Sequence, residues 1–324
     1  MRKITLTMLL VTGFALHSSS QVTLESSEDA KAFLGSYFSP FSETLGAGLN
    51  NGWYNTAKPH KLGGFDVSLT VNLVGISDEN KTFNVKELDN FDVPPEMPSN
   101  TPSILGSGQG SQITYDNGEG ISGTFTMPEQ DFDIPFVPVP TLNAGFGLIK
   151  GTEVNVRYIP NYAFDIGLIG QGSIGLYGGG LKHDILQWIP LAKKLPFDLS
   201  VQAAFNQLNT SFEIESQSVN QEVKMTINSS TYNLIISKKL ALLTAYASAG
   251  ISSTSSQFEG NTTFQLGSTE VITFNVPLDI DFEKESYFQA SAGVRIKLAI
   301  FTITASQTFS EYPTTSAGIG ISFR

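Results

Sequence analysis

The sequence contains no cysteine, which excludes disulfide bonds and thiolate metal sites. Charged residues make up only 15% of the chain, and a net charge of −11 with no basic stripe argues against binding to nucleic-acid phosphates. After residue 20 no stretch reaches the roughly eighteen consecutive apolar residues that a membrane-spanning helix needs. We therefore predict no nucleic-acid partner and no helical membrane span.

Catalytic motifs are also missing. Beyond the first twenty residues the histidines are His60 and His183, and they do not have the spacing of a metal-binding pair. No nucleophile elbow is present, and the glycine-rich run 170–180 is not followed by the helix and lysine of a phosphate-binding loop. We predict that the chain is not an enzyme and holds no metal or cofactor. A Ser–His pair assembled from distant strands is the alternative.

The first twenty residues have the features of a secretory signal. Arg2 and Lys3 precede an apolar run over 4–16, and Ser18 and Ser20 stand three and one residues before a cleavage point at Gln21. A short buried helix is the alternative. The pattern predicts export, and the absence of cysteine argues against a lipid anchor at the cleavage site.

The most regular feature of the chain is a two-residue alternation, which is clearest in its last forty residues. Over 288–298 the even positions are apolar and the odd ones are glycine or polar, and the pattern returns over 301–306 and 317–323. The polar face is too continuous for an ordinary sandwich core. Tilted strands about ten residues long just cross a bilayer. The pattern therefore predicts an all-β fold, an antiparallel transmembrane barrel of the outer-membrane type.

Other segments continue this pattern and set the expected strand number. The first strand runs from Phe65 to Leu73, and a hairpin turns at Lys150-Gly151. Short and long connections alternate: 238–241 is tight, whereas 209–222 and 254–284 are long and polar, as in membrane barrels. One strand at 64–76, nine from 141 onward and up to two more, at 82–88 and 120–127, give ten or twelve; we expect about twelve, within a range of ten to fourteen. The prolines at 135–140 argue against a central strand there.

The segment before the first strand has a different character. Phe33 and Tyr37 lie on the apolar face of a short predicted helix, and a Gly- and Asn-rich stretch with Trp53 and Tyr54 follows. We expect a signal peptide at 1–20, a plug-like segment at 21–61 on the periplasmic mouth, and a barrel over 62–324. A surface helix packed under the first strand is the alternative to the plug.

Charged and amide side chains on the polar faces of the strands are the candidate site. If the apolar faces meet lipid, these side chains point into the lumen, where opposite charges can form a constriction that sorts solutes. Alternatively, they pair with one another in a filled, closed interior. The residues are Asp66, Glu153, Arg157, Asp198, Gln202, Arg295 and Lys297.

A short amphipathic segment between two strands predicts a membrane-water boundary. It carries Trp188 together with Lys193 and Lys194, and aromatic and basic side chains favour that boundary. A helical connector that covers a core is the alternative.

Three motifs carry a resemblance to known proteins. The stretches GLIKGTEVNVRYIP (147–160) and GLYGGGLKHDILQWIP (175–190), with the terminal Phe323-Arg324, resemble an uncharacterised family of predicted outer-membrane barrels of Bacteroidetes-type bacteria. The N-terminal helix and Gly-rich segment are distantly similar to the long-chain fatty acid (FadL/TodX) transporter superfamily, where such a segment forms a hatch. That superfamily commonly carries Tyr-Asn-Pro-Ala near the hatch, whereas this chain has Tyr54-Asn55-Thr56-Ala57. The resemblance implies recognition of the terminal strand by the barrel-assembly machinery.

These observations lead to one functional expectation and two alternatives. We expect a barrel in the bacterial outer membrane, in contact with its lipid, that passes small hydrophobic or amphiphilic solutes. The first alternative is a non-transporting surface barrel whose long loops bind a partner. The second is a soluble secreted β-sandwich.

Overall fold

The structure is a computed structural model. The predicted signal at 1–20, Lys193, Lys194 and Arg324 lie outside the residues that it describes. The described residues are 21–24, 27–118, 122–127, 129, 135–166, 170–190, 195–216, 219–266 and 271–323.

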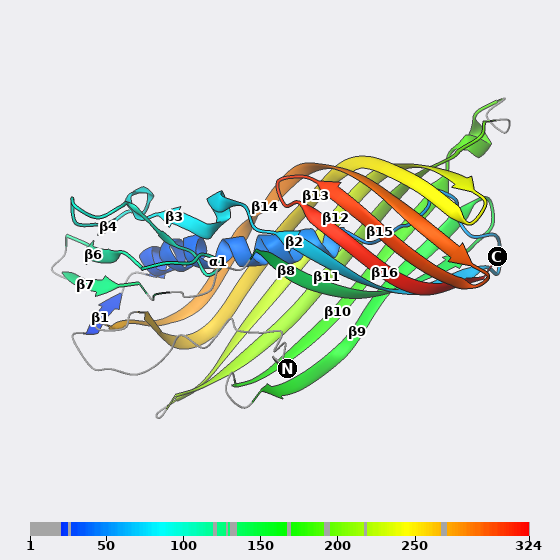
Figure 1. The fold of residues 1–324 in the computed structure, drawn as a ribbon. Helices are drawn as coiled ribbons and strands as arrows, with labels where there is room; N and C mark the ends of the chain where they lie inside the picture. Colours follow the sequence, from blue (N-terminus) through cyan, green and yellow to red (C-terminus); the bar gives the residue numbers. More distant parts are fainter. Residues whose placement is uncertain are drawn as a thin grey trace, which may run out of the picture.

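Ten antiparallel strands close into a barrel (Figure 1). The first of them, β2 (Phe65–Gly75), pairs with the last, β16 (Thr314–Phe323), along its length, which completes the ring. A short strand, β1 (Gln21–Leu24), adds to β14 in parallel. The remaining barrel strands are β8 (Phe136–Gly147), β9 (Thr152–Ile166), β10 (Gly170–Asp184), β11 (Asp198–Ser216), β12 (Val219–Leu240), β13 (Leu243–Leu266), β14 (Val271–Leu298) and β15 (Phe301–Phe309).

The expected count of about twelve barrel strands is wrong, because the two extra segments belong elsewhere. β3 (Thr82–Asn84) and β7 (Ser122–Thr126) are strands, but they lie in two small separate sheets. With three and five residues they are too short to cross a membrane, which takes about nine to eleven. Their neighbours are β4 (Phe91–Asp92), β5 (Asn100–Pro102), β6 (Gln112–Asp116) and the 3₁₀ segments η1 (Asp78–Lys81) and η2 (Val85–Glu87).

The expectation that prolines exclude a strand at 135–140 is also wrong, since β8 contains Pro138 and Pro140. β8 pairs with β2 over Phe136–Phe146, but its pairing with β9 covers only Asn143–Gly147 of these described strands. The prolines therefore lie where β8 behaves as an edge strand, and there a missing N–H is tolerated.

The two ends of the barrel differ. Tight turns join β8 to β9, β12 to β13 and β14 to β15, with left-handed φ at Lys150 (53°), Ala241 (53°) and Ala299 (55°). We call this the turn end, and the opposite end the loop end. The segments 209–222 and 254–284, which we predicted as loops, are largely strand: β11 to β14 run far past the other strands at the loop end (Figure 1).

One helix, α1 (Ser27–Asn50), begins at the loop end and runs into the barrel, and residues 51–64 continue to the turn end, where β2 starts (Figure 1). We expected the plug-like segment to cover the mouth with the tight turns. That position is wrong for the helix, because it enters the barrel from the loop end. Gly46 and Gly48 allow the helix to touch the wall: an added Cβ would lie 2.2 Å from Thr254 Cγ2 and 2.4 Å from Val139 Cγ2, respectively. No helix among the described residues is long and apolar enough to cross a membrane.

The outer half of α1 packs against the small sheets rather than in the lumen. We call this unit, residues 27–39 with 82–118 and 122–127, the head. The ring of Phe33 lies 5.0 Å from that of Phe91 and 5.7 Å from those of Phe83 and Phe125. Tyr37 stacks edge-on against Phe83 in the same cluster. Phe33 and Tyr37, which we expected in the plug, therefore belong to the head core. The helix leaves the head near Pro40, which lacks the N–H of a regular helical bond.

Candidate functional site: the plugged lumen

The barrel is wide enough to hold a helix and little more. Ten strands about 4.8 Å apart and tilted by about 40° enclose a backbone cylinder roughly 20 Å across. A helix with side chains is about 10 Å wide, and the inward-facing wall side chains take up the remainder. We call residues 41–60, the inner half of α1 and the segment after it, the plug.

Arg157 on β9 holds the point where the helix ends. Its side chain is fully buried, and its Nη1 and Nη2 donate to the carbonyls of Leu49 and Asn51 at 2.5 and 2.6 Å. The guanidinium also donates to Asn143 Oδ1 and lies 3.9 Å above the ring of Trp53. A cation that binds the last carbonyls of a helix stabilises its C-terminus. The predicted constriction residue is therefore an anchor for the plug.

Polar side chains of the wall bind the rest of the plug, mostly through its backbone. Asn72 donates to the Gly48 carbonyl at 2.9 Å, and Asn206 donates to that of Leu49 at 3.0 Å. Further along, the Ala57 amide donates to Ser237 Oγ at 2.9 Å, and Ser200 donates to the Ala57 carbonyl. Because buried backbone groups need partners, these side chains replace the hydrogen bonds that secondary structure would supply.

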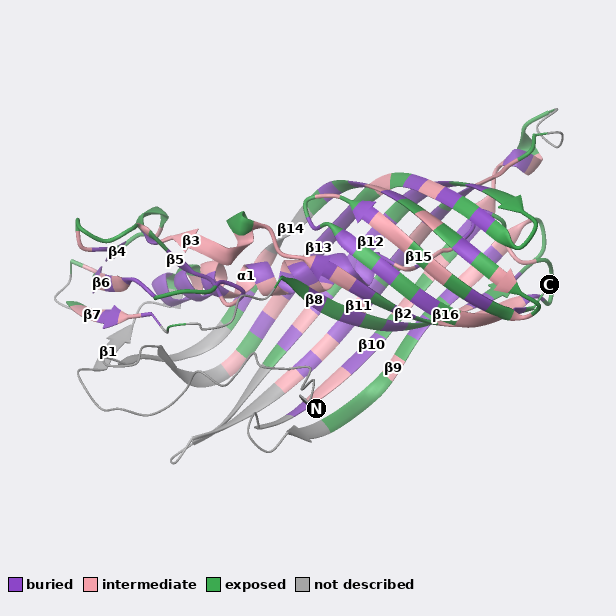
Figure 2. Ribbon diagram, viewed as in Figure 1, coloured by how far each residue is buried: buried purple, intermediate pink, exposed green. Residues whose placement is uncertain are grey.

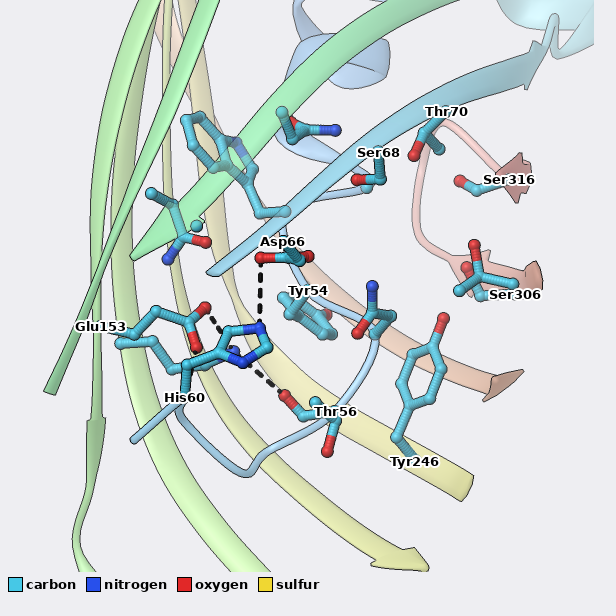
Figure 3. Close-up of a pocket in the computed structure, with 18 residues that line it drawn as sticks. Tyr54, Thr56, His60, Asp66, Ser68, Thr70, Glu153, Tyr246, Ser306 and Ser316 are labelled. Atoms are coloured by element: carbon cyan, nitrogen blue, oxygen red, sulfur yellow. Dashed lines mark hydrogen bonds and ion pairs between the residues drawn. The ribbon is translucent and has the colours of Figure 1, made fainter. Parts of the chain in front are cut away.

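A network of charged groups binds the plug near the turn end (Figure 3). Glu153 forms an ion pair with Lys182 at 2.8 Å and accepts the backbone N–H of His60 at 2.8 Å. His60 Nε2 lies 3.3 Å from Asp66 Oδ1, and Arg295 donates to Asn55 Oδ1 at 2.9 Å. The structure thus places Asp66, Glu153 and Arg295 around the plug rather than around an open pore.

A cavity of about 30 Å³ remains beside these groups. Trp53, Asn143 and Asn155 line it, and Trp53 Nε1, Asn143 Nδ2 and Asn155 Nδ2 have no protein partner. The volume holds about two water molecules, which would satisfy these donors. A solute does not fit, so the described lumen is closed at this level.

The other predicted site residues lie at the edges of this network. Gln202 donates to the Trp53 carbonyl at 3.4 Å, and Tyr54 bonds to Ser248 and Ser291. Asp198 and Lys297 are half-buried toward the turn end; they contact Lys58 at 3.8 Å and Ser322 at 3.1 Å, respectively. Trp188, in the 3₁₀ segment η3 (Leu186–Trp188), is 65% exposed and donates to His183 Nε2 at 2.8 Å.

Sequence reasoning missed the uncharged anchors Asn72, Asn206 and Ser237. Their position on the polar faces of the strands was the available signal. The prediction favoured charged side chains on those faces and left these three out. Within the described part of the chain, no three His, Asp or Glu side chains gather closely enough to hold a metal ion.

Exposed residues alternate with buried ones along the barrel strands (Figure 2), and the exposed ones form the outer face. From the turn end toward the loop end, the outward-facing side chains are mostly apolar and exposed, as at Leu181, Val201 and Leu234. They form an apolar belt around the barrel. This belt ends toward the loop end in a row of aromatic side chains that are each at least half exposed. We call this row the aromatic girdle. It consists of Tyr158, Tyr177, Phe205, Tyr232, Phe288 and Phe309.

Several solved structures are similar to this chain at low identity. They include Ail, the attachment invasion locus protein of Yersinia pestis (10% identity, TM-score 0.29, 81% of this chain and 99% of that one). The beta domain of the Bordetella autotransporter BrkA has 11% identity and a TM-score of 0.36, with 81% and 99% of the two chains covered. The toluene transporter TbuX of Ralstonia pickettii has 8% identity and a TM-score of 0.26, with 81% and 90% covered. These values are too low to support any argument about function.

No curated protein matches the chain. One family model does, and it matches nearly the whole sequence, residues 1–323. The chain therefore belongs to the family of unknown function DUF6588.

Proposed function

We propose that the barrel spans the bacterial outer membrane, with the turn end in the periplasm and the head outside. The apolar belt supports this placement. On β14 the outward-facing residues run from Leu298 to Phe288, ten residue steps, or about 33 Å along the strand and about 25 Å along the barrel axis at a tilt near 40°. That height matches the apolar band of outer-membrane barrels.

A charge placed in the middle of the belt tests the membrane placement. Val294 faces outward between Ala245 and Ala305, halfway along this run. We expect Val294→Arg to lower the free energy of unfolding by about 2–4 kcal/mol, because the guanidinium would lie in hydrocarbon. The measurement is urea unfolding in phospholipid vesicles. Thr226→Arg, on the outer wall beyond the girdle, is the matched control and is expected to cost less than about 1 kcal/mol. Equal effects would refute the placement.

We further propose that the protein is a gated channel for small hydrophobic or amphiphilic solutes and that the structure is its closed state. The observation that supports this best is that the lumen is filled by a separate segment rather than by side chains of the wall alone. The end of its helix packs apolar side chains such as Leu49 against the wall, and the part after the helix is held mainly by hydrogen bonds. Such a segment can be displaced as a unit, which would leave an opening about as wide as a helix, roughly 10 Å.

A groove at the loop end supports the class of solute. It lies between α1 and β14 and has a volume of about 580 Å³, a size that fits small ligands. Ala32, Ile280 and Phe282 give it apolar surface, while Lys31 and the carboxylates of Glu43, Asp279 and Asp281 add charge. This mixed lining suits an amphiphilic molecule that approaches the plug from outside.

An engineered disulfide tests the gating. Thr56 Oγ1 on the plug lies 3.1 Å from Ser237 Oγ on β12, so Thr56→Cys with Ser237→Cys is expected to lock the plug in a chain that has no other thiol. In planar bilayers under voltage, we expect the oxidised variant to lose at least about 90% of the open events, and a reductant to restore them, if displacement of the plug opens the pore.

The control for the lock joins two wall strands and leaves the plug free. Ser230 and Ser253 on β12 and β13 lie 2.7 Å apart, and the corresponding double cysteine variant is expected to conduct in both redox states. The channel proposal fails if the wild-type protein and the double cysteine variant, reduced or oxidised, all show no conductance. This includes recordings in the presence of detergent-like solutes. The remaining candidate is then a surface barrel whose head binds a partner.

A further inference from the structure

A hollow on the outer face of the barrel lies along the aromatic girdle and has a volume of about 640 Å³. Two neighbouring rows of outward-facing side chains line it, and each row crosses five paired strands from β9 to β13. The row nearer the loop end is Tyr158, Tyr177, Gln207, Asn228 and Ser255. The row nearer the turn end is Val156, Gly179, Phe205, Ser230 and Ser253.

The second row forms a slot because its side chains alternate in size. Gly179 lies between Val156 and Phe205 in the paired strands, and a Cβ added to it would meet nothing within 4 Å. Beyond Phe205, Ser230 and Ser253 lie directly opposite each other, and their hydroxyls form a hydrogen bond of 2.7 Å. Because these side chains are small, the wall has a second depression there. The surrounding belt carries larger side chains, such as Leu181 and Tyr232, so the hollow is a local feature of the wall.

The chemistry of the hollow is neutral and rich in hydrogen-bonding groups. The first row presents the rings of Tyr158 and Tyr177, which are 61% and 52% exposed, beside the amides of Gln207 and Asn228. Tyr177 donates to Gln207 Oε1, which fixes that amide against the ring. Neither row contains an acidic or basic side chain. Arg157 also borders the hollow, but its guanidinium is fully buried and binds the plug on the inner side of the wall. Flat aromatic faces next to amides and hydroxyls suit a hydroxylated uncharged ring, whereas a phosphate would require cations.

We propose that this hollow binds a glycolipid of the outer leaflet, with a neutral sugar against Tyr158 and Tyr177 and an acyl chain in the slot at Gly179. The position supports a lipid rather than a soluble sugar, because the slot continues directly into the apolar belt and the amide row lies at its outer edge. The inference rests on the membrane placement proposed above and is independent of gating.

Native mass spectrometry of the full mature protein in detergent tests the proposal, with a monoglucosyl diacylglycerol as the probe. The comparison ligands are the diacylglycerol with the same chains, phosphatidylglycerol with those chains, and maltose. We expect the glucolipid to bind at least about tenfold more tightly than each of them. Gly179→Leu, which fills the slot, is expected to weaken glucolipid binding about tenfold, and Asn228→Ala with Ser255→Ala is expected to remove the preference for the sugar.

Ala249→Leu is the matched control, since it adds a branched apolar side chain of the same final size to an exposed outward position on β13 outside the hollow, and it is expected to leave binding unchanged. The proposal is overturned if Gly179→Leu binds as wild type, if the sugarless lipids bind equally well, or if maltose binds as tightly as the glucolipid. A dimer that forms without lipid and is lost in Gly179→Leu would also overturn it, because the hollow would then be an interface between copies. Since the assay measures no conductance, its failure is distinct from failure of the channel.

Discussion

Replacement of Arg157 by methionine is expected to lower the free energy of unfolding by about 2–4 kcal/mol and to release the plug. Methionine keeps much of the volume but removes the donors that bind the Asn51 carbonyl and Asn143 Oδ1, and both acceptors are buried. The Leu49 carbonyl would keep Asn206 as a partner, and the Asn51 carbonyl would keep only a long contact of 3.5 Å from Asn72 Nδ2. Urea unfolding in vesicles measures the stability, and planar bilayers measure the open probability, which we expect to rise at least about tenfold.

Arg295→Met is the matched comparison because it removes a second inward-facing arginine. Arg295 makes one hydrogen bond to the plug, to Asn55, and its Nε has no partner. We expect a loss of about 1 kcal/mol. If the two variants behave alike, the anchoring role of Arg157 at the helix end is wrong and a general effect of lumen charge is the better account.

A cysteine at the start of the helix is expected to react from outside intact cells. Glu28 is exposed in the first turn of α1 at the loop end, so Glu28→Cys should react with a membrane-impermeant maleimide as fully in intact cells as in permeabilised ones. Lys239→Cys at the turn end should react at least about tenfold more after permeabilisation. The natural chain has no cysteine, so each signal comes from one position.

Lys86→Cys in the head supplies the outside reference for this experiment, since Lys86 is exposed there. If Lys86→Cys reacts on intact cells and Glu28→Cys does not, the helix enters from the periplasm and the threading seen in the structure is wrong. If both react only after permeabilisation, the orientation of the barrel is reversed.

The barrel wall between the turn end and the aromatic girdle was predictable because its two faces differ. Along β16 and along β2 as far as Asn72, the inward-facing residues are polar or glycine and the outward-facing ones are mainly apolar, so the two-residue period reports directly on the wall. The sequence predicts loops in the extensions of β11 to β14 because most positions there are polar, and isolated apolar residues such as Phe258 make no regular alternation. Ser255 and Ser256 illustrate this: Ser255 lines the outer hollow and Ser256 is buried, and the sequence gives no contrast between them.

For the site residues, the sequence predicts the side of the wall on which each side chain lies but not its partners. Alternation places Glu153, Arg157 and Arg295 on the inner side, and the structure agrees, but their partners lie about one hundred or more positions away in the plug. Backbone carbonyls such as that of Asn51 leave no mark in the sequence, so the choice between a charge-lined pore and a filled interior was not decidable from residue types. The direction in which α1 enters was equally hidden, because a helix before the first strand fits either end.

The position of α1 inside a closed ring restricts the order of assembly. The ring closes where β16, the last barrel strand in the chain, pairs with β2. A helix already joined to a folded head cannot be pushed in afterwards, so the amino-terminal chain must cross the nascent barrel before this seam forms. Folding of the head at the loop end then prevents the chain from sliding back.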